Sequence, residues 1–101
     1  MSEVVRIERV DAAHARVAGT LGFADAPAAL QRGEALFGGG ERELKLDVSG
    51  LTGVDSATLA ILLAWAARAA ERGTRLVVAG APESLKALAH LCDAEPLLGI
   101  A

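Results

Sequence analysis

The amino-acid sequence predicts an α/β fold, with one mixed β-sheet and helices packed mainly on one of its faces. Short apolar segments typical of strands alternate with longer segments of helical periodicity, in the order β-β-α-β-α-β-α. The chain has 101 residues, of which 52% are hydrophobic, so it is long enough for one core and too short for two. Aromatic residues make up only 3%, so Ala, Leu and Val must build the core. We therefore expect one domain spanning residues 1–101.

The first half of the chain predicts a β-hairpin followed by a helix. Glu3–Val10 partly alternates apolar and charged residues, and a turn leads from it into a second strand, His14–Ala18. A helix follows over about Ala24–Phe37, in which Asp25 can cap the start, Pro27 fits the first turn, and Leu30, Leu36 and Phe37 form the apolar side.

The second half predicts two further strands and two further helices. Three glycines, Gly38–Gly40, end the first helix and lack the Gly-Lys-Ser/Thr that would make a phosphate-binding loop. Leu44–Val48 and Thr74–Ala79 are strands, and the second helix runs between them from about Ser56 to Arg72. The third helix extends from Pro82 to about Cys92 and faces the core with Leu85, Leu88, Ala89 and Cys92. Residues 97–100 form either a short strand or a packed coil.

The faces of the second helix give the first indication of a binding surface. At 100° per residue one stripe should bury against the sheet: Leu59, Leu62, Leu63, Ala66 and Ala70. The opposite side carries Ala57, Ile61, Ala64 and Arg68, with Thr58, Trp65 and Arg72 alongside. Trp and Arg are over-represented among the anchors of protein interfaces, so this side is a candidate docking surface. Alternatively, Trp65 packs against the third helix.

Asp55 and Ser56 open this helix directly after a strand and a glycine-punctuated loop. They lie where unpaired N–H groups and the positive end of the helix dipole gather. Such a junction can bind an anion, carry a phosphorylatable hydroxyl or dock a partner, and capping of the helix alone also explains both residues.

Composition and motifs exclude several other classes of function. The net charge of −3 comes without a basic cluster or an aromatic series, which argues against nucleic acid as a partner. The single cysteine, the lack of a leader sequence and the short apolar runs favour a soluble cytoplasmic domain. His14 and His90 are expected to be exposed, and no spacing indicates a metal site, a cofactor or catalytic residues.

The segment from Leu46 to Ala60 resembles the STAS domain family, with a strand ending in Leu-Asp-Val-Ser-Gly and a helix opened by Val-Asp-Ser-Ala-Thr-Leu-Ala. The strand Gly73–Gly80 and the helix around Leu85–Leu91 also fit, so the resemblance covers most of the chain. It implies a STAS-like fold and a function in binding other proteins.

Two branches of the family imply different partners. Phosphorylation-switched anti-sigma factor antagonists carry the modified hydroxyl two residues after the Asp, where this chain has Ala57, although Ser56 and Thr58 keep hydroxyls nearby. MlaB-like subunits of phospholipid ABC transporters have the hydroxyl directly after the Asp, as Ser56 is here. This second resemblance implies contact with the transporter's ATPase, and membrane association only through that complex. The implied contact residues are Asp55, Ser56, Ala57, Thr58, Ile61, Ala64, Trp65 and Arg68. The first branch, with an anti-sigma factor kinase as the partner, is the alternative.

Overall fold

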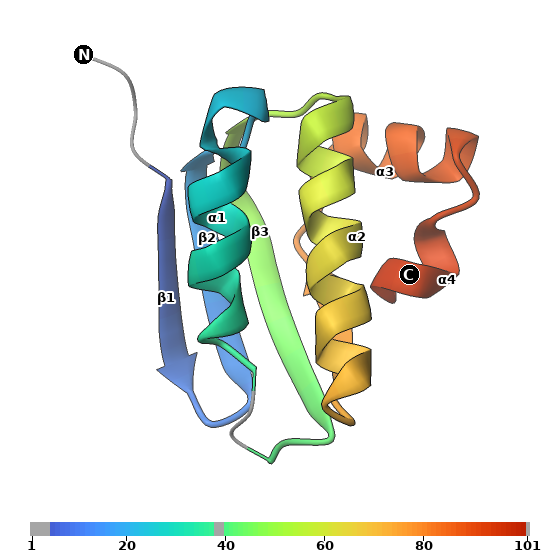
Figure 1. Cartoon of the computed structure of the whole chain (residues 1–101). Coiled ribbons are helices and arrows are strands. Elements are labelled where there is room, and N and C mark those ends of the chain that lie inside the picture. Colours follow the sequence, from blue (N-terminus) through green and yellow to red (C-terminus); the bar gives the residue numbers. More distant parts are fainter. Residues whose placement is uncertain (1–4, 38–39, 101) are drawn as a thin grey trace.

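The computed structural model describes residues 5–37 and 40–100, and these form one layered α/β unit (Figure 1). The elements follow in the order β1 (Arg6–Asp11), β2 (His14–Thr20), η1 (Phe23–Asp25, a 3₁₀ turn), α1 (Ala26–Glu34), β3 (Glu43–Gly53), α2 (Ser56–Glu71), β4 (Arg75–Ala79), α3 (Glu83–Leu91) and α4 (Glu95–Leu98). The predicted order is therefore confirmed, with η1 and α4 added. The start of the first predicted strand (Glu3 and Val4) and two of the three glycines (Gly38 and Gly39) lie outside the described residues.

The four strands form a mixed sheet in the order β1-β2-β3-β4. The hairpin strands β1 and β2 are antiparallel, whereas β2 pairs with β3, and β3 with β4, in parallel. Alternate residues of β2, β3 and β4 are buried, because their side chains point in turn toward the helices and away from them.

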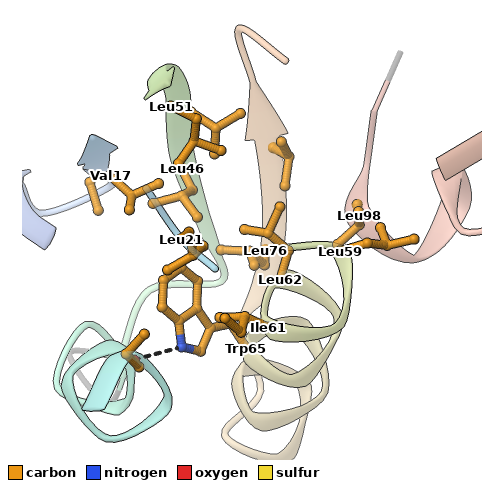
Figure 2. Close-up of a cluster of buried hydrophobic side chains, with 14 of the residues drawn as sticks. Val17, Leu21, Leu46, Leu51, Leu59, Ile61, Leu62, Trp65, Leu76 and Leu98 are labelled. Atoms are coloured by element: carbon orange, nitrogen blue, oxygen red, sulfur yellow. Dashed lines mark hydrogen bonds between the residues drawn. The ribbon is translucent and has the colours of Figure 1, made fainter. Parts of the chain in front are cut away.

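Helices α1 and α2 cover one face of this sheet and lie side by side, with their N-termini at the same end (Figure 1). Helix α3 and the short α4 pack against α2 on the side of β4. The core lies between the sheet and these helices (Figure 2), and its largest fully buried side chains include Trp65, Leu21, Leu44, Leu46, Leu62, Leu85 and Leu98.

The other face of the sheet is open and carries mostly charged side chains. Several cross-strand neighbours on this face have opposite charges: Arg16 lies between Glu8 and Asp47, and Glu43 lies opposite Arg75. Such pairing stabilises a sheet surface in contact with water, so this face needs no covering layer.

Several expected features are wrong in detail. Asp25 makes no side-chain cap for α1. Of the predicted strand or coil at residues 97–100, Leu97 and Leu98 instead belong to the short helix α4 (Glu95–Leu98), which Gly99 caps. Cys92 is exposed, because it lies just beyond the last residue of α3, Leu91, which is itself 80% exposed. Leu88 is only partly buried, whereas Leu85 and Ala89 are buried as predicted.

Candidate functional site

The start of α2 is fixed by a reciprocal capping box. Asp55 has extended backbone angles, and its Oδ1 accepts a hydrogen bond from the backbone N–H of Thr58 at 3.0 Å. In return, the backbone N–H of Asp55 donates to the hydroxyl of Thr58 at 3.1 Å. The capping interpretation of this junction is therefore confirmed for Asp55, with Thr58 as its partner.

The same threonine ties the start of α2 to the end of β2. Thr58 is buried, with 1% of its surface exposed, and its hydroxyl donates to the carbonyl of Leu21 at 2.8 Å. Because Leu21 is itself fully buried, the turn that follows it is held beside the first turn of α2. That turn, η1, carries Phe23, whose side chain is 84% exposed.

An apolar hollow of about 480 Å³ lies between the first turns of α1 and α2, and we call it the α1–α2 groove. Small residues of α2 form one wall, with Ile61 at the base, while η1 and α1 form the other wall. Its lining is Phe23, Ala26, Leu30, Ser56, Ala57, Ala60 and Ile61. The exposed phenyl ring and the small side chains make this a surface on which another protein can pack.

The charges along the groove are unevenly distributed. At the end where both helices begin, Asp25 and Asp55 form no ion pair with any described residue. Farther along the helices, Glu34 of α1 and Arg68 of α2 form an ion pair with each other. The end where both helices begin is therefore acidic, whereas the other end carries the additional positive charge of Arg72, whose guanidinium donates to the backbone carbonyl of Glu34 at 2.9 Å.

Trp65 does not lie on the outer side of α2, and the prediction that it is an interface anchor is wrong. Its side chain is 0% exposed and lies between α1 and the sheet (Figure 2). The indole N–H donates to the carbonyl of Ala29 at 3.2 Å, so Trp65 packs against α1 and not against the third helix. The close approach depends on Gly33, where an added Cβ would overlap the indole ring.

The other predicted positions on α2 divide between the core and the groove. Ile61 is only 2% exposed, so its expected outward position is also wrong, although it reaches the base of the groove. The expected buried stripe is correct for Leu59 and Leu62, but Leu63 and Ala66 are half-buried and Ala70 is exposed. The physical reason is that α2 packs on the sheet, on α1 and on α4, which makes the buried arc wide and turns it toward Trp65.

Of the predicted residues at the helix start, Ser56 and Ala57 line the groove, and Asp55 precedes them as the cap of α2. Ala64 is half-buried farther along α2, and Arg68 is exposed beyond it. Sequence reasoning missed Phe23, Ala26, Leu30 and Ala60 as parts of the site. An aromatic residue directly before a helix that is otherwise short of aromatics was the signal that could have identified Phe23.

A second hollow, of about 600 Å³, lies on the open face of the sheet. Its charged lining is Asp11, His14, Arg16, Lys45 and Asp47. Here Asp11 contacts His14 at 2.8 Å, and Asp47 Oδ1 accepts from the backbone N–H of Ser49 at 2.9 Å. These local bonds lower the pKa of both carboxyl groups: the main cause is the N–H of Ala13 for Asp11 and the N–H of Ser49 for Asp47. The charges are matched within the face itself, so the α1–α2 groove remains the stronger candidate.

Little else in the described part of the chain suggests chemistry. No group of three or more His, Cys, Asp or Glu side chains among these residues is placed to hold a metal ion. His14 and His90 are exposed, as predicted. Among the described helices, none is long and apolar enough to cross a membrane.

The fold and the site together define a small α/β domain with an uncovered apolar groove at the start of a capped helix. A family profile described as the MlaB-type STAS domain matches residues 5–99. The chain therefore belongs to the STAS domain family and resembles its MlaB branch.

The comparison with solved structures agrees on the fold. The crystal structure of an anti-sigma factor antagonist from Mycobacterium paratuberculosis matches with a TM-score of 0.70 and 24% sequence identity, over 94% of this chain and 81% of that one. No curated protein matches the chain significantly.

Proposed function

We propose that this chain is a non-catalytic accessory subunit that binds the ATPase of a phospholipid-transport ABC system. Membership in the STAS family, with resemblance to its MlaB branch, supports this assignment. The observation that carries it is the exposed ring of Phe23 beside an uncovered apolar groove at the start of α2. This is the helix end that carries Ser56, where the sequence resemblance implies contact with the ATPase.

The anchor of this contact is Phe23, because Trp65 is already used in the core. Covering a fully exposed Phe side chain contributes about 2 kcal/mol to association, and the small residues of α2 let a partner approach closely. Ser56 and Ala57 complete the contact at the helix start, and Ala64 and Arg68 lie along its continuation. Asp55 and Thr58 act indirectly, since their capping box holds this end of the helix in place.

The domain acts by binding and not by chemistry. Docking favours an active arrangement of the ATPase if the domain binds that arrangement more tightly than the alternatives. The proposal requires neither a cofactor nor nucleic acid, and it places the chain in the cytoplasm, at the membrane only through the transporter complex.

The test is binding of the purified ATPase subunit of such a transporter from the same organism to the wild type, Ala60→Arg and Phe23→Ala. Ala60 is exposed and lines the groove, so an arginine there blocks the groove without entering the core. We expect each substitution to weaken binding at least about tenfold, equivalent to roughly 1.4 kcal/mol, with thermal stability nearly unchanged. Lys45→Glu, on the open face of the sheet, is the control and should bind normally. Undiminished binding by Ala60→Arg would exclude the groove as the docking site.

One observation favours a second candidate function, that of an anti-sigma factor antagonist controlled by a kinase. Ser56 is exposed, and its hydroxyl is accessible at the first position of α2. Thr58 does not share this accessibility, because its hydroxyl is buried in the bonds to Asp55 and Leu21. A phosphate on Ser56, close to Asp55, would repel an acidic partner surface.

Mass spectrometry after incubation with the organism's anti-sigma factor kinases separates the two functions. Stoichiometric phosphate on Ser56, lost in Ser56→Ala, would support the second candidate and exclude the transporter assignment. An unmodified chain that binds the ATPase supports the first.

A further inference from the structure

We infer that the element seated in the α1–α2 groove is an amphipathic helix of the partner, oriented with a lysine or arginine over Asp25 and Asp55. This inference rests on the proposed docking function and specifies the chemistry of its partner. The apolar side chains of the helix enter the groove, and its basic residue lies at the end where α1 and α2 begin.

The shape of the groove suits a helix better than an extended strand. Its walls are two neighbouring helices that begin at the same end of the domain (Figure 1), and the first two turns of both helices line it. The α2 wall consists of Ser56, Ala57 and Ala60, whose short side chains let another helix lie close. Helices bind such grooves with apolar residues spaced three to four positions apart.

The charges fix the direction of the bound helix. Asp25 and Asp55 form no ion pair within the described residues, whereas farther along Glu34 and Arg68 pair with each other and Arg72 adds a positive charge. A partner with a basic residue at the end where α1 and α2 begin would pair with the Asp25 carboxylate, which forms no ion pair among the described residues. The same residue would lie near the charge of Asp55, whose carboxylate already accepts hydrogen bonds from Thr58. Such complementarity mainly raises the association rate and discriminates between partners.

Two other occupants fit these charges less well. A second copy of this chain related by a twofold axis would bring the negative charges of Asp25 and Asp55 in one copy toward those of the other copy across the contact. An acidic segment drawn to the helix start would meet Asp25 and Asp55, and the Thr58 N–H in the first turn is already bonded to Asp55.

Photo-crosslinking to the purified ATPase identifies the occupant directly. The probe replaces Phe23 with p-benzoylphenylalanine, which keeps the phenyl ring of the anchor, and the added benzoyl group does not disturb the fold because Phe23 is 84% exposed. We expect the crosslinked peptide to come from a helix of the ATPase that has a lysine or arginine within one turn of the modified residue. Crosslinks to a loop, to an acidic segment or to a second copy of the chain would overturn the inference.

A charge reversal tests the orientation independently. Asp25→Lys should lower the association rate about tenfold at low salt and remove most of its salt dependence. The matched control is Glu71→Lys, which makes the same change of charge at the far end of α2 and should have little effect. Asp25→Asn, which removes the charge without reversing it, should give an intermediate rate.

The outcomes of these experiments distinguish failure of this inference from failure of the docking proposal on which it rests. Equal effects of Asp25→Lys and Glu71→Lys would overturn the basic-helix assignment, while loss of binding by Ala60→Arg would still support docking in the groove. Normal binding by Ala60→Arg, or no binding by the wild type, would overturn both.

Discussion

Gly33 and Trp65 show how one glycine permits the largest buried side chain of the domain. Gly33 lies in the third turn of α1, where glycine is about 1 kcal/mol less favourable than alanine. Its absent Cβ leaves the space that the indole ring fills, and this lets the Trp65 N–H reach the Ala29 carbonyl. Packing between the helices therefore outweighs the local cost to α1.

Gly33→Ala should consequently destabilise the domain, although alanine favours helices. We expect a loss of about 1–3 kcal/mol or more, because the new methyl group overlaps the indole in a close-packed core. In a Trp65→Leu background the same substitution should cost far less, since the overlapping ring is gone. Urea unfolding of the four variants in this cycle measures the coupling. If the effects of Gly33→Ala and Trp65→Leu on the free energy of unfolding were additive, the overlap of the new methyl group with the indole would not be the cause of the destabilisation.

Individual side chains on α2 were the part of the site least predictable from the sequence. Periodicity identifies apolar positions on both sides of the helix but does not rank them by burial, because Leu59 and Ile61 are equally apolar. Which side faces inward depends on α1, whose contact through Gly33 joins residues more than thirty positions apart in the sequence. The position of η1 beside the start of α2 likewise depends on a tertiary contact, the hydrogen bond from the Thr58 hydroxyl to the Leu21 carbonyl.

At the scale of elements, β3 is longer and less regular than the predicted strand. Its pairing with β2 shifts register between Asp47 and Gly50, where β3 has one residue more than β2, as in a β-bulge. The Asp47 carboxylate accepts from the Ser49 N–H inside this irregular segment. Gly50 follows, where an added Cβ would lie 2.8 Å from the Cβ of Ala18. This arrangement carries β3 past the predicted end, Val48, toward the start of α2.

The Asp47 bond makes the stability of this segment dependent on pH. The Ser49 N–H lowers the pKa of Asp47 in the folded state, so the bond is fully stabilising above the ordinary Asp pKa of 3.8 and weakens as the pH falls through the lower folded value. Asp47→Asn should therefore reduce the free energy of unfolding by roughly 1 kcal/mol at pH 7. Urea unfolding from pH 7 to about pH 3 should show this difference narrowing below the ordinary Asp pKa.

Glu71→Gln, an exposed neutralisation on α2, is the control for that titration. A difference for Asp47→Asn that stays constant over the whole pH range would show that the charge of Asp47 contributes nothing to the bulge.

Elements with strong local signals were predictable, and those defined by packing were not. The bounds of α2 follow from Asp55 at its start and Gly73 just beyond its end, and they agree with the prediction within one residue. The segment after Cys92 has no such periodicity. It becomes a short helix because Leu98 is fully buried, in contact with the core formed by α2 and β4.

At the scale of the whole molecule, the domain separates a closed helical side from an open charged side. Leu and Ala residues fill the space between the sheet and the helices, as expected from a composition with few aromatics. The open face of the sheet has its own charge pairing, and the groove is apolar and uncovered. This difference is why binding is assigned to the helical side.

The α1–α2 contact and the sheet share one core, so the domain should unfold as a single cooperative unit. Trp65 is the only tryptophan, and its fluorescence reports the contact of α2 with α1, while far-ultraviolet circular dichroism reports all helices and strands. The two signals should give coincident urea transitions with the same midpoint and slope. Because the groove is built from α1 and α2, a fluorescence transition at lower urea would show that this layer opens before the sheet. If α1 and α2 separated in this way, the groove would not be preformed for a partner. Binding would then depend on the fraction of molecules in which the two helices are packed together.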